Sequence, residues 1–309
     1  MPSAFRINDI ILVIVVISSM AVAVIFPDFG SRFKEYPFYC LMLNFFLSYL
    51  AIDLAAVWKA LKGHTVQIVT LTFLKLIALP VAVYFIFYFI APKYALAAML
   101  LSGVSSGVVS PMISNMVGGN SALVLIVVVI TSALAPFTLP GIVEILLAKQ
   151  VAISFMAMLK MLATAIFIPI IAVEIIRYLM PRLVAPILKV QFPLALTAFA
   201  LINLGVFYRY APFFKKEPSV IIMATVVVFV LAVIYCVVGI LFSRGSSLEN
   251  QLASAVILAN INNVLVIVFS SQFFGPVEPL VAAMYMIPFF VVIIPLRYYH
   301  HRKSRAAWR

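Results

Sequence analysis

Three groups of polar residues interrupt long apolar stretches of the sequence, where charged and amide side chains are costly. Lys75 is the tenth residue of the apolar stretch 66–90. Serines, glycines and Pro111 interrupt the stretch 94–117, and three asparagines within four residues (260, 262 and 263) interrupt the stretch 248–273. Polar groups in such surroundings need partners, water or a bound ligand. These residues therefore predict a buried site that binds or moves a small polar molecule or ion.

The elements that position these residues are predicted to be membrane-spanning helices. Of the 309 residues, 66% are hydrophobic and 10% are charged, whereas a soluble globular chain is about 45–50% apolar and about 25% charged. A helix needs roughly 20 apolar residues to cross a bilayer. Stretches of this kind occupy residues 7–26, 39–57, 66–90, 94–117, 121–147, 159–179, 190–210, 219–242, 248–273 and 277–298. The sequence thus predicts ten transmembrane helices in an all-α integral membrane protein, with one polytopic domain over 1–309 and a basic tail at 299–309.

The basic residues are expected to set the topology. There are 21 Lys and Arg against 9 Asp and Glu, a net charge of +12. Twelve of the basic residues fall on the side that holds both termini and eight on the other, with Lys75 on neither. Because basic loops stay in the cytoplasm, both termini are predicted to be cytoplasmic and the protein to lie in the inner (plasma) membrane. The partners of this charge are lipid headgroups rather than nucleic acid.

The interrupted stretches occupy matching positions in the two halves of the chain. They are the fourth of the first five helices (7–147) and the fourth of the second five (159–298), and an odd number of helices inverts the second half relative to the first. In inverted-repeat transporters, paired interruptions indicate the binding site. The alternative is that the small residues only allow close helix packing and the asparagines only join helices. The predicted site comprises Ser106, Ser110, Pro111, Asn260, Asn262 and Asn263.

At these residues the sequence resembles the bile acid:sodium symporter family. The resemblance is clearest at 105–112 and 119–123, and it continues through 131–140 with its two prolines four residues apart. Leu79-Pro80 and Ile168-Pro169 fit as well. The resemblance implies ten helices in two inverted five-helix repeats, with broken fourth and ninth helices that cross. It also implies secondary active transport of an organic anion.

The chain departs from the family at the positions that bind sodium. The resemblance implies cation ligands from a Ser-Asn pair, from the fifth helix, from a glutamine on the third helix and from a Glu-x-x-x-Gln-Asn motif on the ninth. At these positions the chain has Ser110 and Pro111, Val124 and Val128, Lys75, and Leu258 with Asn262 and Asn263. Sodium prefers several oxygen ligands. At most Ser110, Asn262 and Asn263 remain, so sodium coupling is not expected, and neither is any other metal or cofactor.

Lys75 is too deep in its stretch to reach the membrane surface, so a functional role is expected. Its ammonium could replace the bound cation, carry a proton, or pair with an anionic substrate. The structural alternative is a buried ion pair with Asp53 or Glu144.

The predicted function is secondary active transport of a small organic anion by alternating access, with the first, second, sixth and seventh spans forming a panel. The sequence lacks a Ser-His-acid grouping and a phosphate-binding loop, so an enzyme is not expected. One alternative is a proton-coupled or uncoupled carrier that uses Lys75. Another is a receptor or scaffold with the transporter fold that has lost transport. A channel is less favoured because no ring of charges recurs in the spans.

Overall fold

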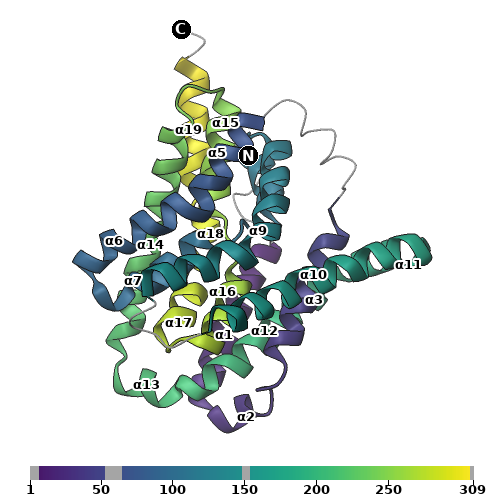
Figure 1. Cartoon of the computed structure of the whole chain (residues 1–309), viewed down its shortest axis with the longest axis vertical. Helices are drawn as coiled ribbons and strands as arrows, with labels where there is room; N and C mark the ends of the chain where they lie inside the picture. The colour runs from purple at the N-terminus through teal and green to yellow at the C-terminus, as the bar shows by residue number, and fades with distance from the viewer. Residues whose placement is uncertain (1–6, 53–64, 148–153, 307–309) are drawn as a thin grey trace.

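The computed structural model describes residues 7–52, 65–147 and 154–306, and within these ranges the regular elements are helices (Figure 1). The β-structure in this part of the chain is one isolated antiparallel bridge between Ser106 and Ile261. The prediction of an all-helical protein is therefore confirmed for the described residues.

Six of the predicted spans form helices or helix series that are long and apolar enough to cross a membrane. Each begins and ends within a few residues of the predicted bounds, apart from the extensions at 210–216 and 298–305. They are Thr65–Ile90, Ser121–Leu147, Phe155–Leu179, Gln191–Lys216, Ser219–Phe242 and Val277–Arg305. In Figure 1 the single helices among them carry the labels α9, α10 and α14. The helix series are α5 (Thr65–Phe73) and α6 (Leu79–Ile90), α12 (Gln191–Phe207) and α13 (Ala211–Lys216), and α17 (Val277–Met284), α18 (Met286–Val291) and α19 (Ile293–Ala306). The chain is thus a multi-pass membrane protein, while the count of ten spans stays a prediction.

The other four predicted spans are shorter helices or pairs of half-helices. α1 (Ile7–Ile25) and α3 (Pro37–Leu50) are single helices. The fourth predicted span is divided into α7 (Pro92–Gly103) and α8 (Ser110–Val117), and the ninth into α15 (Leu248–Ala259) and α16 (Asn263–Phe273). The two interruptions predicted from the sequence are therefore real breaks in the helices.

Local chemistry explains where the second half of each broken helix begins. Pro111 lies in the first turn of α8, where its missing N–H costs no hydrogen bond. Asn262 precedes α16, and its Oδ1 accepts a hydrogen bond from the N–H of Leu265 at 3.2 Å. Side-chain caps of this kind satisfy the free N–H groups of a first helical turn. Proline and asparagine thus restart the helices after the extended segments 104–107 and 260–262, which we call the crossing.

The two broken helices run in opposite directions. The first ends at the turn before α9, where the N–H of Asn120 donates to the carbonyl of Glu249 at 3.0 Å and its amide to Asn250 Oδ1 at 2.9 Å. Both partners belong to the first turn of α15. The second broken helix therefore begins where the first one ends.

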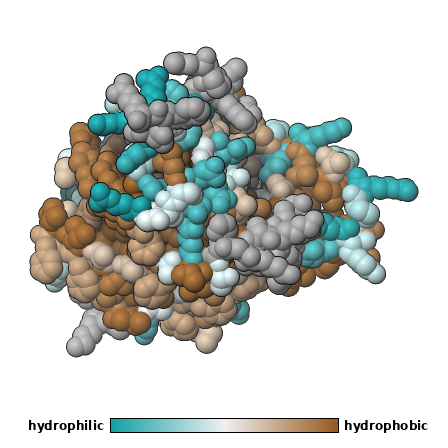
Figure 2. Space-filling view, turned by 90° about the horizontal axis from the view of Figure 1, so that it is seen from above, coloured by the Kyte–Doolittle hydropathy of each residue, from teal (hydrophilic) through white to brown (hydrophobic). Residues whose placement is uncertain are grey.

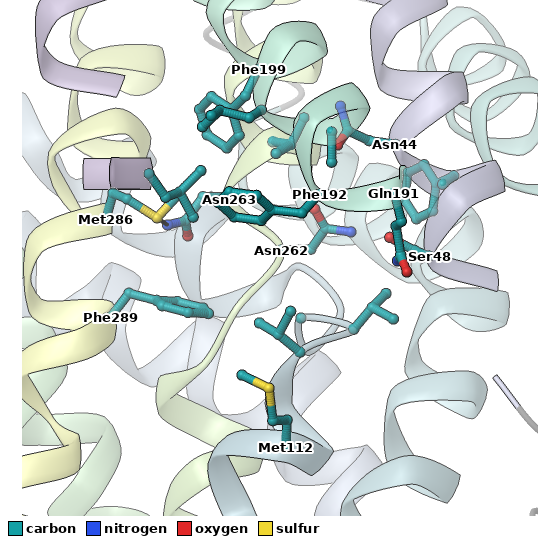
Figure 3. Close-up of a pocket in the computed structure, with 18 of the residues that line it drawn as sticks. Asn44, Ser48, Met112, Gln191, Phe192, Phe199, Asn262, Asn263, Met286 and Phe289 are labelled. Atoms are coloured by element: carbon teal, nitrogen blue, oxygen red, sulfur yellow. Dashed lines mark hydrogen bonds between the residues drawn. The ribbon is translucent and has the colours of Figure 1, made fainter. Parts of the chain in front are cut away.

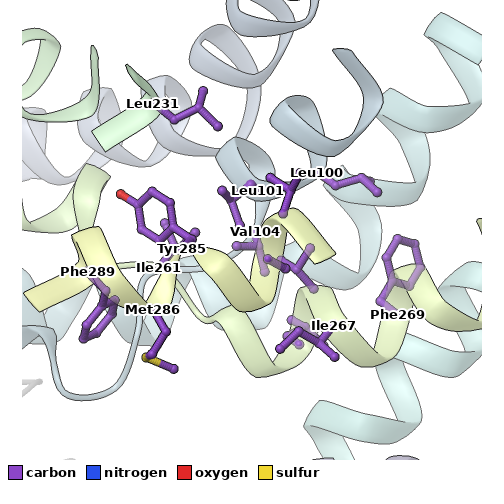
Figure 4. Packing of buried hydrophobic residues seen from close by; sticks show 14 of the residues in the cluster. Leu100, Leu101, Val104, Leu231, Ile261, Ile267, Phe269, Tyr285, Met286 and Phe289 are labelled. Carbon is purple, nitrogen blue, oxygen red and sulfur yellow. The ribbon is translucent and has the colours of Figure 1, made fainter. Parts of the chain in front are cut away.

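The helices pack as two groups, and the crossing belongs to the larger one. α3 packs on α10 and α12, and α12 packs on α1; the larger group contains α6–α9 and α14–α17, and α10 also packs on α9. Figure 4 shows Leu101, Val104 and Ile267 within the buried apolar cluster beside the crossing. In the view from the end of the molecule that holds the C-terminus, hydrophilic residues gather over the middle and hydrophobic residues cover much of the flank (Figure 2). This distribution suits a protein whose flanks face lipid.

Candidate functional site

The two breaks contact each other through their backbones. The N–H of Gly107 donates to the carbonyl of Asn260 at 2.7 Å, and the N–H of Asn262 donates to the carbonyl of Ser105 at 3.0 Å. Backbone groups that have left a helix inside a membrane must find partners within the protein. Each extended segment therefore supplies the partners that the other one lacks.

Two serines predicted to line the site strengthen this contact. Ser106 Oγ donates to the carbonyl of Ile257 at 2.8 Å, and Ser110 Oγ donates to the carbonyl of Asn260 at 3.0 Å. Both side chains are fully buried. The Ser106 N–H also donates to Thr131 Oγ1 on α9 at 3.3 Å. These hydroxyl groups hold the crossing together, and neither serine is among the residues that line the adjoining cavity.

A cavity of about 420 Å³ lies between the two helix groups, directly against the crossing. One wall comes from α1, α3 and the α11–α12 region (α11 is Pro181–Lys189), and the other from the crossing, α8 and the region after α17. Figure 3 labels ten of the lining residues: Asn44, Ser48, Met112, Gln191, Phe192, Phe199, Asn262, Asn263, Met286 and Phe289.

The chemistry of the cavity favours an anion that carries an apolar body. Residues 107–109 before α8 and the first residues of α16 line it, so two helix N-termini, each with partial positive charge, meet at one wall. Among the described lining residues, Lys189 carries the only formal charge. Phenylalanines 192, 199 and 289 supply apolar surface, while Asn44, Ser48 and Gln191 supply polar groups.

The structure separates the residues predicted from the sequence into two sets. Asn262 and Asn263 line the cavity, and the Oδ1 atom of Asn263 is buried without a hydrogen-bond partner among the described residues. Asn260 is fully buried, and its amide donates to the carbonyl of Phe289 at 2.9 Å. Ser106, Ser110 and Pro111 are, like Asn260, absent from the cavity lining.

The opposite wall contains polar residues that the sequence interpretation missed. Asn44 and Ser48 are four residues apart on α3 and therefore share one face of the helix. Two polar residues four positions apart inside a predicted span are the sequence feature from which this face could have been predicted. Gln191 is the first residue of α12 and had no such signal, because a polar residue at the end of a span is ordinary.

Lys75 lies behind the crossing and is not among the residues that line the cavity. Its side chain is fully buried, and Nζ donates to the carbonyl of Leu258 at 3.3 Å. The predicted ion pair with Glu144 is wrong: Glu144 is exposed, and no carboxylate in the described residues pairs with Lys75. The other predicted partner, Asp53, lies outside the described residues. Direct pairing of Lys75 with a substrate in this cavity is not supported.

The residues at the crossing do not fit a sodium site of the kind that the resemblance implied. Asn262 Oδ1 already accepts the hydrogen bond that caps α16, and Ser110 Oγ is bonded to Asn260. At the two positions where the resemblance implied a glutamine and a glutamate, the chain has Lys75 and Leu258, whose side chains offer no oxygen atom. Within the described ranges, no group of three or more His, Cys, Asp or Glu side chains is placed to hold a metal.

Two broken helices that meet inside a bundle of membrane-spanning helices, beside a cavity, are the arrangement that inverted-repeat transporters use for their binding sites. Residues 10–211 match the Sodium Bile acid symporter family, so the chain belongs to that family and the resemblance seen in the sequence is confirmed. Members of this family are transporters rather than enzymes. No curated protein matches the chain.

Loss of the Asn262 cap is expected to weaken both the crossing and the cavity wall. Asn262→Ala should lower the free energy of unfolding by about 1 kcal/mol, because the first turn of α16 loses its side-chain acceptor. Asn262→Asp should retain most of the stability. Thermal unfolding of the purified protein measures this, and Ser247→Ala, which removes the exposed cap of α15, is the matched control. Transport should fall for Asn262→Ala, and also for Asn262→Asp, because its carboxylate would repel an anion in the cavity that this residue lines. Ser247→Ala should transport normally, and wild-type transport by Asn262→Ala would contradict the role of the cavity.

Proposed function

We propose that the protein is a secondary active transporter of a small organic anion, and that the cavity beside the crossing is its substrate site. The observation that carries this proposal is the meeting of two helix N-termini, α8 and α16, at the wall of one cavity. An anionic group placed there would be stabilised by the partial positive charge and the backbone N–H groups of the two helix N-termini, and it would not need a formally charged partner. The phenylalanine side chains would contact the apolar part of the same molecule.

The position of the cavity supports transport by alternating access. It lies where α1, α3 and α12 meet the helices that carry the crossing. Rocking of one group against the other would open the cavity to one side of the membrane and then to the other. The cavity reaches Lys189 and Gln191, in a connection that the count of basic residues predicts to be cytoplasmic, so this conformation would face inward. The opposite directions of the broken helices support two inverted repeats.

Transport by this protein is expected to be independent of sodium, because most of the cation ligands that the resemblance implied are replaced, and Ser110 and Asn262 are already hydrogen-bonded. Uptake of a labelled bile acid, and of labelled aromatic monocarboxylates, is measured in proteoliposomes with sodium or potassium as the only alkali cation. Equal initial rates are expected, with protein-free liposomes as the control. A strict requirement for sodium would contradict this prediction.

The same measurement separates the proposal from its alternatives. Uptake that is accelerated by an imposed pH gradient would indicate that the protein is a proton-coupled carrier. Binding of the anion, seen as a rise in melting temperature, without uptake would assign a receptor rather than a carrier.

A further inference from the structure

The C-terminal end of α15 is surrounded by hydrogen-bond donors from distant parts of the chain. The carbonyls of Ile257, Leu258 and Ala259 cannot be paired within the helix in the usual way, because the helix ends at Ala259. Ser106 Oγ donates to the first at 2.8 Å, Lys75 Nζ to the second at 3.3 Å and the hydroxyl of Tyr285 to the third at 2.7 Å. Of these three donors, only Lys75 carries a charge.

The surroundings of the ammonium group favour a positive charge only through dipoles and an aromatic ring. The end of a helix carries partial negative charge, and Lys75 Nζ lies 5.7 Å from the ring centroid of Tyr235, within the range of a cation–π interaction. The Tyr235 hydroxyl is in turn 2.6 Å from Ser102 Oγ. No carboxylate among the described residues forms an ion pair with Lys75.

A local irregularity of the backbone accompanies this placement of Lys75. Residues Leu74–Ala78 form a π-helical turn, in which the N–H of Leu79 bonds to the carbonyl of Leu74. Pro80 follows and has no N–H to donate to the carbonyl of Leu76, which permits the wider turn. The wider turn shifts the helical register between α5 and α6, at the point where the lysine must reach α15.

We infer that the Lys75 ammonium is a built-in monovalent cation: it neutralises the C-terminal end of α15 and keeps the crossing assembled without a bound ion. Lys75 is thus a positioning residue that acts on the crossing through Leu258. The inference goes beyond the proposed function and does not depend on the identity of the substrate, because it concerns the assembly of the helices. It predicts that removal of the ammonium leaves a site that a small free cation can fill.

The test is rescue of a truncated variant by small cations, read as thermal stability without substrate. Lys75→Ala should melt roughly 5 °C below the wild type. Ethylammonium should restore most of this loss with saturable dependence, whereas tetramethylammonium, which has no N–H donor, should not. Lys75→Met, which fills the same space without charge, should not respond to ethylammonium. Lys93→Ala, which removes an exposed lysine paired with Glu217 at 2.7 Å, is the matched control and should show neither loss nor rescue.

Several results would overturn the inference. One is a Lys75→Ala protein that is as stable as the wild type or indifferent to ethylammonium. Another is rescue that is equal for Lys75→Ala and Lys75→Met. A third is stabilisation of the wild type by sodium, which would show that a free ion binds although the lysine is present. If the rescue occurs but no organic anion is transported, the proposed function fails while this inference stands.

Discussion

Replacement of Gly107 by valine is expected to abolish transport while the protein remains folded. A Cβ atom at this position would lie 3.1 Å from the carbonyl oxygen of Ile261 and 3.5 Å from that of Asn260. These neighbours are backbone atoms of the other extended segment, and the two methyl groups of valine would add to the crowding. The segments would have to separate, which would break the 2.7 Å hydrogen bond from the Gly107 N–H to Asn260. The N-terminus of α8 would then no longer face the cavity.

Uptake by the Gly107→Val protein in proteoliposomes should be indistinguishable from that of protein-free liposomes. Gly245→Val is the matched control, because Gly245 also lies outside a helix and a Cβ there meets no atom within 4 Å. Elution as a single species of wild-type size would show that both variants fold. Wild-type uptake by Gly107→Val would mean that close contact of the two segments is not needed for transport.

The largest loss of stability is expected for Gly239→Ala. Gly239 lies in α14 where this helix packs on α15, and a Cβ there would lie 2.6–2.8 Å from backbone atoms of Ser254 and Ala255. Because backbone atoms cannot rotate away as a flexible side chain could, α14 and α15 must move apart. Overpacking of this kind costs about 1–3 kcal/mol. The displaced helix carries Leu258 and is followed directly by Asn260 of the crossing, so transport should fall as well.

Gly141→Ala is the control for this variant, because Gly141 also lies inside a helix but has no atom within 4 Å of the added Cβ. Alanine is favoured over glycine in a helix by about 0.5–1 kcal/mol. Gly141→Ala should therefore melt at or slightly above the wild-type temperature, whereas Gly239→Ala should melt below it. Equal melting temperatures of the two variants would show that the contact between α14 and α15 can relax without cost.

Features that depend on a short length of chain could be predicted from the sequence. The lengths of apolar stretches predicted the six long spans, and the runs around Pro111 and Asn262 predicted the two breaks. The transfer of a segment into lipid depends on its own side chains. A proline or a capping asparagine likewise acts on the helical turn in which it lies. The family could be recognised for the same reason, because its motifs are continuous stretches of sequence.

The assignment of side chains to the site could be predicted only in part. Asn262 and Asn263 line the cavity, whereas Ser106, Ser110 and Asn260 bond to the opposite segment or to Phe289 instead. A polar residue in an apolar stretch indicates that a partner exists, but it does not indicate whether that partner is protein or ligand. Asn44 and Gln191, on the facing wall, were missed because the sequence does not show which helices face each other.

By itself, the sequence determined that this is a membrane protein of the sodium bile acid symporter family with two interrupted helices and a lysine inside a span. Only the tertiary structure decided what the lysine contacts: the carbonyl of Leu258, 183 residues away, rather than Glu144. The rotation of a membrane helix about its axis is set by packing against its neighbours and not by its own hydropathy. The partner of Lys75 therefore depends on how α5–α6, α14 and α15 come together, which no single stretch of sequence encodes.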